Sequence, residues 1–405
     1  MKVLYFHQHF TTPDGSSGTR SYEFARALIA RGHKVTMVCG RSDRSGLDLP
    51  LDSRKGWHRG DIDGIDVIAL PLAYSNSDGV AKRLLTFARF AWKSIGIALS
   101  EEYDLLFATS TPLTAAVPGI FARWLRHKPF VFEVRDLWPE LPRAMGMKNP
   151  LLLGGMWALE GLAYRSSTAC IGLAPGIVEG IARRSAPRHP IAMVPNGCDL
   201  DLFHPGLRGP LDIPGIFPGD FVAGFTGAHG RANGLDAILD AAAVLKRRGA
   251  RNIKLLLVGD GSEKPRLLAR VVTEGLDNVI FHPPVPKRRL ASLTASLGCG
   301  LMTLDNIPAF YRGTSPNKFF DYLSSGIPVI NNYPGWLAEM IGAGGLGEAV
   351  PAGDAEAFAT ALVRLASDPA LAAKQGLAAR NFAEGHFRRE TLADQFTVVL
   401  EDALS

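Results

Sequence analysis

The sequence lacks a long apolar run and contains few cysteines. No segment reaches about 18 consecutive uncharged apolar residues, so no membrane-spanning helix is expected. The first ten residues lack the pattern of a secretion signal and read as a buried strand. The cysteines have neither metal-binding nor redox spacing, and most lie in or beside apolar runs, which predicts buried free thiols in a reducing cytoplasm. They are Cys39, Cys170, Cys198 and Cys299.

The sequence also lacks the GxGxxG pattern of dinucleotide-binding proteins. Its first glycine loop, Asp14–Gly18, precedes a predicted helix, and no acidic residue ends the next strand at Cys39–Gly40. Both absences disfavour an NAD-dependent oxidoreductase. Glycines at a helix N-terminus still let a ligand approach the backbone, so we expect either an acceptor or diphosphate loop or a plain tight turn. The residues of this loop are Gly15, Ser16, Ser17 and Gly18.

Negative charge is sparse in the first half of the chain. Residues 1–200 carry 24 Lys and Arg against 18 Asp and Glu, whereas residues 201–405 carry 20 against 21. A basic half suggests an anionic partner such as membrane lipid or a phosphorylated acceptor. The predicted helix Val80–Ser100 places Lys82, Arg89 and Lys93 in one stripe opposite an apolar face. This pattern fits a membrane-surface helix or a core-packing helix with a basic solvent face.

A strand, glycine loop, helix and second strand occur twice, about 220 residues apart. The first copy spans residues 1–40 and the second residues 221–261. Near-continuous apolar strands of this kind are typical of parallel sheets that are covered on both faces. The 405 residues therefore predict two doubly wound α/β domains. The predicted strands are Lys2–Phe6, Lys34–Val38, Ile65–Leu70, Leu105–Thr109, Phe130–Val134, Ala169–Leu173, Ile191–Val194, Phe221–Thr226, Lys254–Val258, Val279–Phe281, Gly298–Met302 and Ile327–Ile330.

Composition marks the connections between these domains. Leu200–Pro218 is rich in proline and glycine and reads as a linker. We place the first domain at residues 1–203, the second at 204–385, and a terminal helix at 386–405 that could dock on either. Arg41–Arg59, charged and rich in glycine and proline, is expected to be a mobile loop at the end of the second strand.

The segment Gly313–Ile330 has the features of a nucleotide site. Ser315 and Pro316 are good helix openers, and Gly326 is a good helix stop. A helix N-terminus binds anions, and Lys318 adds a positive charge where it would oppose the helix dipole in the absence of an anion. Asp321, about one turn further, could accept hydrogen bonds from a ribose. The alternative is an ordinary helix with a solvated lysine and aspartate.

Two further loops carry polar residues at predicted strand ends. Gly227–Gly234 contains Arg231, which could grip a diphosphate or remain solvated. Glu133–Pro139 ends a buried strand, at the edge where parallel sheets bind ligands. Arg135 and Asp136 would be costly to bury there without partners, and Trp138 could form a wall for a sugar ring. An arginine–carboxylate cluster that only braces the loop is the alternative.

Together these segments resemble the retaining glycosyltransferases of family four, and most closely the bacterial subgroup of O-antigen and exopolysaccharide synthesis that includes N-acetyl-L-fucosamine transferases. The resemblance spans nearly the whole chain. The matching stretches are GSSGTRSYEFARALIARGHKV, FEVRDLWPE, VPNGCDLDLF, FTGAHGRANGL, LLLVGDG and SPNKFFDYLSSGIPVI. It implies a GT-B fold, in which two Rossmann-like doubly wound domains face a central cleft.

The resemblance also implies the reaction and its partners. The donor would be a nucleotide-diphosphate sugar, with UDP favoured, bound to the second domain. The acceptor would be a glycan or a polyprenyl-diphosphate-linked molecule on the first domain, and configuration would be retained. We expect no metal, no cofactor and no nucleic acid. We expect a cytoplasmic protein with peripheral contact to the inner face of the membrane through residues 80–100.

Site residues follow from the matched motifs. The catalytic group is expected to comprise Lys318, Arg231, Arg135 and Asp136, with Trp138 and the first glycine loop near the acceptor. Asn317 and Lys318 match positions whose backbone N–H groups meet donor phosphate, and Arg135 matches a position often held by histidine beside the reacting centre. The expected donor-binding residues are Gly227, Gly230, Asn233, Gly261, Val285, Thr314, Ser315, Asn317 and Asp321.

The chain departs from the family pattern at several of these positions. Members typically carry two acids eight residues apart, but here the first position is Gly313 and the second is Asp321 in place of glutamate. The arginine and lysine that are frequent in the second glycine loop fall on Ala228 and Asn233. Arg231 and Lys318 are the substitutes that the sequence offers. Two other functions stay open, a nucleotide-sugar 2-epimerase of the same fold and a non-catalytic nucleotide-sugar-binding protein.

Overall fold

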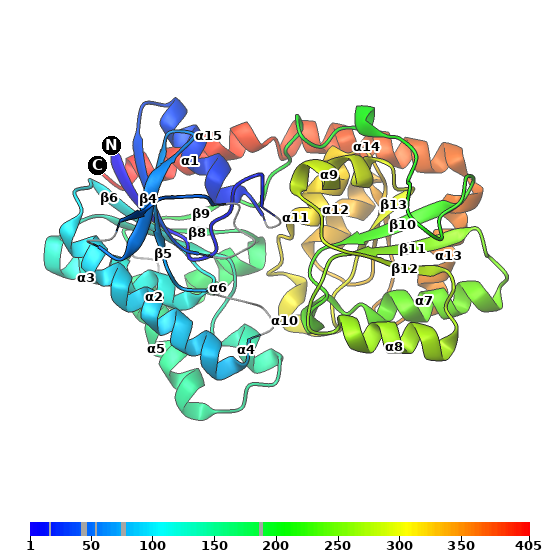
Figure 1. Ribbon diagram of the computed structural model, residues 1–405, viewed down its shortest axis with the longest axis horizontal. Helices are drawn as coiled ribbons and strands as arrows, with labels where there is room; N and C mark the ends of the chain where they lie inside the picture. Colours follow the sequence, from blue (N-terminus) through cyan, green and yellow to red (C-terminus); the bar gives the residue numbers. More distant parts are fainter. Residues whose placement is uncertain (16–17, 42–46, 53–54, 74–77, 186–188) are drawn as a thin grey trace. The chain divides into compact units, whose positions relative to one another are not determined.

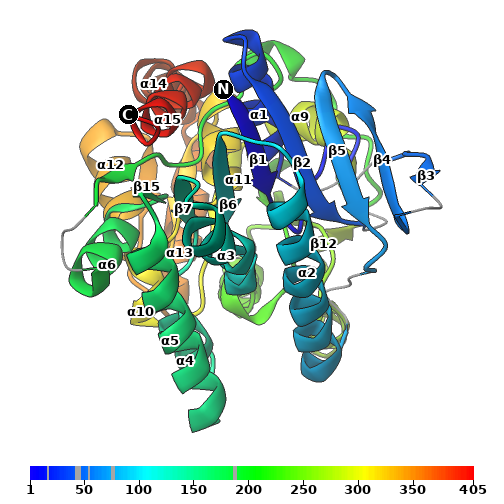
Figure 2. The same ribbon diagram turned by 90° about the vertical axis from the view of Figure 1, so that its left-hand side faces the viewer.

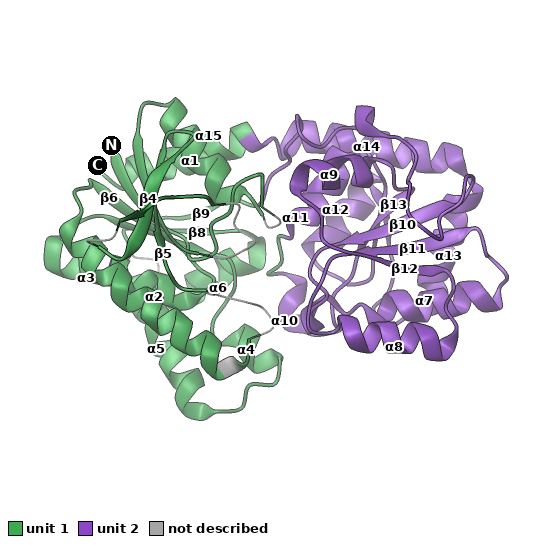
Figure 3. Ribbon diagram, in the orientation of Figure 1, with its two compact units in different colours: residues 1–195, 313–315, 390–405 green, residues 196–312, 316–389 purple. Residues whose placement is uncertain are grey.

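The structure divides into two compact units. It is a computed structural model that describes every residue except 16–17, 42–46, 53–54, 74–77 and 186–188 (Figure 1). Unit 1 comprises residues 1–195, 313–315 and 390–405, and unit 2 comprises residues 196–312 and 316–389 (Figure 3). Among the described residues no helix is both long and apolar enough to cross a membrane.

Unit 1 is built on a nine-stranded sheet within the described residues, in the order β3-β4-β5-β2-β1-β6-β7-β8-β9. The strands from β5 to β9 along this order pair in parallel, whereas β3 and β4 form an antiparallel edge. The carboxyl ends of the parallel strands therefore meet at one edge of the sheet. The strands are β1 (Lys2–Phe6), β2 (Lys34–Gly40), β3 (Leu51–Asp52), β4 (Trp57–Ile62), β5 (Ile65–Leu70), β6 (Leu105–Thr109), β7 (Phe130–Val134), β8 (Ala169–Gly172) and β9 (Ile191–Met193).

Helices cover both faces of this sheet. α1 and α15 pack together on one face, where the rings of Phe24 and Phe396 lie 4.7 Å apart. The other crossover helices connect strands in the opposite direction along the sheet, so right-handed crossovers place them on the other face (Figure 2). These helices are α2, α3, α5 and α6, and each contacts the next in this series. The helices are α1 (Arg20–Ala30), α2 (Val80–Ser100), η1 (Leu113–Ala116), α3 (Val117–Arg126), α4 (Glu140–Ala144), α5 (Pro150–Ser166), α6 (Pro175–Ser185) and α15 (Arg389–Asp402).

Unit 2 has a six-stranded parallel sheet in the order β12-β11-β10-β13-β14-β15, in the part of the chain that the structure describes. α7 and α13 pack on one face, and α11 contacts both α9 and α14 on the other. The strands are β10 (Phe221–Thr226), β11 (Ile253–Val258), β12 (Val279–His282), β13 (Cys299–Met302), β14 (Val329–Asn331) and β15 (Gly347–Ala349). The helices are η2 (Pro205–Leu207), η3 (Arg231–Asn233), α7 (Asp236–Arg247), α8 (Lys264–Glu274), α9 (Lys287–Ala295), α10 (Pro308–Tyr311), α11 (Asn317–Ser324), α12 (Trp336–Gly344), α13 (Ala355–Ser367) and α14 (Pro369–His386).

Two local predictions are wrong. The predicted mobile loop Arg41–Arg59 contains β3 and the start of β4, which form the antiparallel edge (residues 42–46 and 53–54 lie outside the described part). Ser315 does not cap α11, because the cap position is Pro316 and the helix has no side-chain cap bond. The predicted stop holds: Gly326 has φ 64°, and its N–H donates to Leu323 O. The four cysteines are free and buried, as expected.

Candidate functional site

Two glycine loops of unit 2 are joined through their backbones. One follows β10 and the other follows β11. The N–H of Gly227 donates to Val258 O, and the N–H of His229 donates to Asp260 O, each at 2.9 Å. Gly259 has φ 150°, and a Cβ there would lie 1.9 Å from the carbonyl oxygen of Gly227. Glycine is therefore required for the two loops to meet, and together they form one rigid rim at the carboxyl ends of β10 and β11.

Lys318 lies against this rim from the first turn of α11. Its Nζ is 3.7 Å from the ring centroid of Phe225 and donates to Asn233 Oδ1 at 3.3 Å. Among the described residues no carboxylate is ion-paired with it, and burial lowers the pKa of its ammonium from 10.5 to about 7. Gly227 makes room for this side chain, because a Cβ there would approach Lys318 Cε to 3.1 Å. The Lys318 ammonium therefore lies beside the N-terminus of α11, where both the lysine charge and the helix dipole would stabilise a bound anion.

Tyr322 fixes the position of α11 on the sheet. Its buried hydroxyl accepts from Thr226 N at 3.0 Å and donates to Gly224 O at 3.1 Å, so it holds the end of β10. Its ring lies where only glycine fits on β13, because a Cβ at Gly300 would come within 2.3 Å of it. Because Lys318 lies one helical turn from Tyr322 on the same helix, these contacts also fix its position relative to the glycine rim.

Asp321 is buried on α11 with 6% of its surface exposed. Burial raises the pKa of its carboxyl, and the positive charges of Lys287 and Arg389 partly oppose that rise. Its Oδ1 has no hydrogen-bond partner among the described residues. A buried acceptor left without a donor is costly, so this oxygen is suited to receive one from a ligand hydroxyl.

The other expected donor residues differ in their contacts. Asn233 bridges the loop and the lysine, since its Nδ2 donates to Ala228 O at 2.8 Å. Arg231 has 65% of its side chain exposed and its Nε lies 4.0 Å from Asp305 Oδ2. At Gly261 a Cβ would meet His229 O at 2.4 Å. Gly230 is half-buried before η3, Val285 is buried between β12 and α9, Asn317 is the first residue of α11, and Thr314 and Ser315 belong to unit 1.

In unit 1 a buried ion cluster lies at the carboxyl end of β7. Glu133 is fully buried and accepts from Arg20 Nε at 3.0 Å, from Arg20 Nη2 at 2.7 Å and from Thr109 Oγ1 at 2.7 Å. Burial alone would raise the pKa of Glu133, but Arg20 and Arg135 outweigh it and hold the pKa below its usual value. Arg20 also donates to the carbonyls of Val194 and Pro195. The bracing cluster considered from the sequence is therefore present.

Arg135 and Asp136 extend this cluster toward the strand ends. Arg135 Nε donates to Thr109 Oγ1 at 2.7 Å, and its Nη2 donates to Ser21 Oγ at 3.2 Å. Asp136 accepts from Thr111 Oγ1 at 3.0 Å, and burial raises the pKa of its carboxyl. Thr111 has φ 72°, which is a strained backbone conformation for a β-branched residue. Strained conformations of this kind often occur at functional sites.

The Trp138 loop is held by charged partners. Its N–H donates to Glu160 Oε1 at 2.9 Å, and its carbonyl accepts from Arg184 Nη1 at 2.8 Å. Gly15, in the first glycine loop, donates its N–H to Thr12 O at 3.0 Å, whereas Ser16 and Ser17 lie outside the described residues. Gly18 is half-buried.

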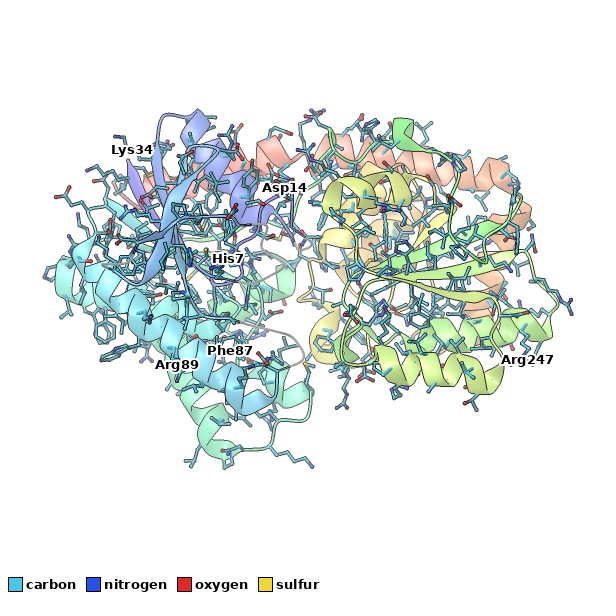
Figure 4. The ribbon with its side chains drawn as sticks, in the orientation of Figure 1. His7, Asp14, Lys34, Phe87, Arg89 and Arg247 are labelled. Atoms are coloured by element: carbon cyan, nitrogen blue, oxygen red, sulfur yellow. The ribbon has the colours of Figure 1, made fainter. Side chains whose placement is uncertain are left out.

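Sequence reasoning missed several residues of these sites. His7, directly after β1 (Figure 4), is buried, and its pKa is well below the usual value because of burial and of Arg135. His229 is fully buried with neither ring nitrogen partnered among the described residues. The polar run after a buried apolar strand was a usable signal for His7. The partners Arg20 and Tyr322 had none, because their contacts lie about 100 residues away.

Comparisons with known proteins agree with this architecture. Residues 15–197 match the glycosyl transferase 4-like domain, and residues 220–368 match the glycosyl transferases group 1 family. No curated protein sequence matches the chain. Sucrose-phosphate synthase from Thermosynechococcus elongatus is 20% identical, with TM-score 0.77, 99% of this chain covered and 98% of that one. Anabaena HepE, solved with UDP and glucose, is 18% identical, with TM-score 0.69 and coverage of 99% and 100%.

WaaG, a glycosyltransferase of lipopolysaccharide biosynthesis, is 15% identical, with TM-score 0.68, 98% of this chain covered and 99% of that one. At these identities the likeness shows the fold. The predicted GT-B fold class, with two parallel-sheet α/β domains, is confirmed.

Proposed function

The chain is a glycosyltransferase built from a 4-like domain and a group 1 domain, and on that basis we propose that it transfers a sugar from a nucleotide diphosphate to a glycan or polyprenyl-diphosphate-linked acceptor. UDP is the favoured nucleotide, because HepE binds UDP and UDP-glucose on the same fold. The product would belong to a bacterial surface polysaccharide such as an O-antigen or exopolysaccharide, as the sequence resemblance implies. The sugar would be a hexose or N-acetylamino sugar.

The position of Lys318 is the observation that most directly supports this proposal. Its ammonium lies at the N-terminus of α11, beside the glycine rim and without a carboxylate partner in the described residues. A donor diphosphate placed there would receive the lysine charge, the free N–H groups of the helix and the rim backbone together. Negative charge on the diphosphate grows as the glycosidic bond breaks, so these groups would stabilise the transition state more than the ground state.

Asp321 is proposed to accept a hydrogen bond from the donor ribose through its unpartnered Oδ1. Arg231, exposed and weakly paired with Asp305, is free to turn toward the diphosphate. A rate gain of at least ~10⁶ requires roughly 8 kcal/mol of transition-state stabilisation. Electrostatic stabilisation of the leaving group by Lys318, Arg231 and the helix is proposed as its main source.

The acceptor is proposed to bind unit 1 near Arg135, Asp136 and Trp138. The raised pKa of Asp136 and the neutral imidazole of His7 both suit contact with uncharged sugar hydroxyls. Retention of configuration is proposed to follow a front-face route, in which the leaving phosphate helps to remove the proton of the acceptor hydroxyl. The protein would act in the cytoplasm, at the inner face of the membrane where lipid-linked acceptors lie.

Thermal-shift measurements with UDP-, GDP-, ADP- and dTDP-sugars would test the donor half of this proposal. A ligand that binds only the native state at about 100 times its Kd stabilises it by about 2.7 kcal/mol, which is readily measured. We expect UDP-sugars to raise Tm and Asp321→Asn to abolish the rise. Lys318→Met should reduce the rise less, because the lysine charge acts mainly in the transition state. No shift with any nucleotide sugar would overturn the assignment.

Turnover measurements distinguish a glycosyltransferase from an epimerase and from a non-catalytic binding protein. NMR of the best donor, with and without mixed lipid-linked glycans, should show loss of the donor only when acceptor is present. Conversion of the donor sugar without acceptor would indicate an epimerase. Donor binding with no turnover in any mixture would indicate a binding protein and would contradict the proposed transfer.

A further inference from the structure

The outer surfaces of α2, α3 and α5 gather exposed tryptophans. Of the six tryptophans in the sequence, three have more than half of their surface exposed in the described structure, and each lies on one of these helices. Trp92 on α2 is 78% exposed, Trp124 on α3 is 56% exposed, and Trp157 on α5 is 60% exposed. α3 contacts both α2 and α5, so the three helices form one layer (Figure 2). We call its outer surface the α2–α3–α5 face.

The apolar character of this face extends beyond the tryptophans. Leu85, Trp92 and Leu99 recur every seven residues and form an exposed stripe along α2. The buried side of α2 is a different surface, which includes Phe90, Ala91, Ile97 and Ala98. Exposed apolar residues continue on the other two helices: Phe121 and Leu125 on α3, and Leu151 and Leu152 on α5.

Exposed charge on this face is positive. α2 and α3 contain no Asp or Glu, and the one acid of α5, Glu160, is buried and paired with Arg184. Arg89 and Lys93 on α2 and Arg123 on α3 are exposed beside the tryptophans (Figure 4 labels Arg89). The acids that flank α2 are paired with other groups, since Asp78 pairs with Lys82, Glu101 with Arg59 and Glu102 with Lys2.

We propose that the α2–α3–α5 face is a peripheral docking surface for an anionic phospholipid bilayer, an inference that rests on the proposed function and its location at the inner face of the membrane. Tryptophan has an apolar ring and a polar N–H and is enriched at the depth of lipid headgroups. Leucine and phenylalanine side chains enter the acyl boundary, while arginine and lysine meet anionic headgroups. Large exposed apolar patches on soluble domains mark contact sites for proteins, membranes or ligands, and the charge of this face favours the membrane.

A second copy of the chain fits this surface less well. An isologous contact would bring the face against itself and oppose Arg89, Lys93 and Arg123 with their own copies. The face has no exposed carboxylate on its three helices to neutralise them. An anionic bilayer satisfies the apolar stripe and the positive charge together.

Co-sedimentation with vesicles would test the proposal. The full chain is mixed with phosphatidylcholine vesicles that do or do not contain phosphatidylglycerol, and bound protein and tryptophan fluorescence are measured. We expect binding to the anionic vesicles that weakens with salt, with a blue shift of emission. W92S/W124S/W157S should lower the partition coefficient onto anionic vesicles by at least about tenfold. R89E/K93E should lower it by at least about fivefold for each positive charge that is lost.

A matched control changes exposed apolar side chains of unit 2. F217S/V272S/L377S removes residues that are 65%, 80% and 63% exposed, so it should leave partitioning unchanged. Folding of all variants is checked by thermal denaturation and by donor binding, which the proposal leaves unaffected. Equal partitioning of the tryptophan variant and the control variant would overturn the proposal. So would concentration-dependent dimerisation that the tryptophan variant abolishes while the wild type ignores vesicles.

Discussion

The ammonium of Lys318 lies 3.7 Å from the ring centroid of Phe225, with Asn233 Oδ1 as its hydrogen-bond acceptor. An aromatic face and a neutral amide stabilise a cation less well than a carboxylate does. Among the described residues Lys318 therefore has no strong anionic partner, and burial lowers the pKa of its ammonium to about 7. A donor diphosphate would supply the missing charge, and two predictions rest on this relationship.

Lys318→Met should lower kcat by about 10²–10³-fold with a smaller change in KM, because the lysine charge matters most when the diphosphate leaves. Lys318→Arg keeps the charge but is bulkier beside Gly227, so it should recover part of the lost activity. Initial rates over a range of donor concentrations separate kcat from KM. Equal kcat in wild type and Lys318→Met would exclude a role for this charge in the chemical step.

The stability of the unliganded protein should rise with pH between about pH 7 and 10.5 through Lys318. In the folded chain burial lowers the pKa of this lysine to about 7, whereas 10.5 is its ordinary value. Across that window the unfolded chain binds more protons, so the free energy of unfolding increases with pH and the destabilisation is fully present below pH 7.

Urea denaturation of wild type and Lys318→Met at a series of pH values measures this effect. The variant should be more stable than wild type near neutral pH, and the difference should shrink toward pH 10. Other titrating groups are shared, so they cancel in the difference. Parallel pH profiles of the two proteins would show that the lysine is not destabilised by burial.

Gly300→Ala should destabilise unit 2 by about 1–3 kcal/mol, because the added methyl would lie 2.3 Å from the Tyr322 ring in a packed core. The displaced ring would also weaken the bonds that its hydroxyl makes with Thr226 and Gly224, so donor affinity should fall as well. Gly342→Ala is the control, since nothing lies within 4 Å of its Cβ and it is inside α12. It should be neutral or stabilising by up to about 1 kcal/mol.

The sequence predicts this fold best where one local pattern decides the structure. Apolar strands such as β1, β5 and β7 lie at the predicted residues, because a strand covered on both faces needs apolar side chains throughout. β4, reading WHRGDI, was missed because it is a half-buried antiparallel strand with few apolar residues. Its pairing partner β5, rather than its own composition, makes it a strand.

The candidate site was predictable in the same uneven way. Lys318 lies in a helix start that local rules identify, although the Ser315 cap expected there is absent. On α2 the helical pattern identified the basic stripe but not the exposed leucine and tryptophan stripe next to it. Periodicity ranks apolar residues by angle, and only tertiary packing decides which of two apolar stripes is buried. Arg20 and Glu133 are 113 residues apart, so only the folded chain shows their contact.

Breaking the Arg20–Glu133 pair should destabilise unit 1 strongly. The two side chains are 2% and 0% exposed, so removing one partner leaves a charge buried without compensation. We expect Arg20→Met and Glu133→Leu each to cost about 3–5 kcal/mol, measured as the free energy of unfolding in urea. Arg20→Met would also leave the carbonyls of Val194 and Pro195 without their donor.

The double variant Arg20→Met/Glu133→Leu should be clearly less destabilised than the sum of the two single variants, because neither charge remains. A double-mutant cycle gives this coupling energy directly. Lys2→Ala, Glu102→Ala and their double variant form the matched cycle for an exposed pair, with side chains 51% and 86% exposed, and should give no more than about 1 kcal/mol. Additive single effects at Arg20 and Glu133 would mean that each residue acts through its other partners, Thr109 and Arg135 for the glutamate and the two carbonyls for the arginine.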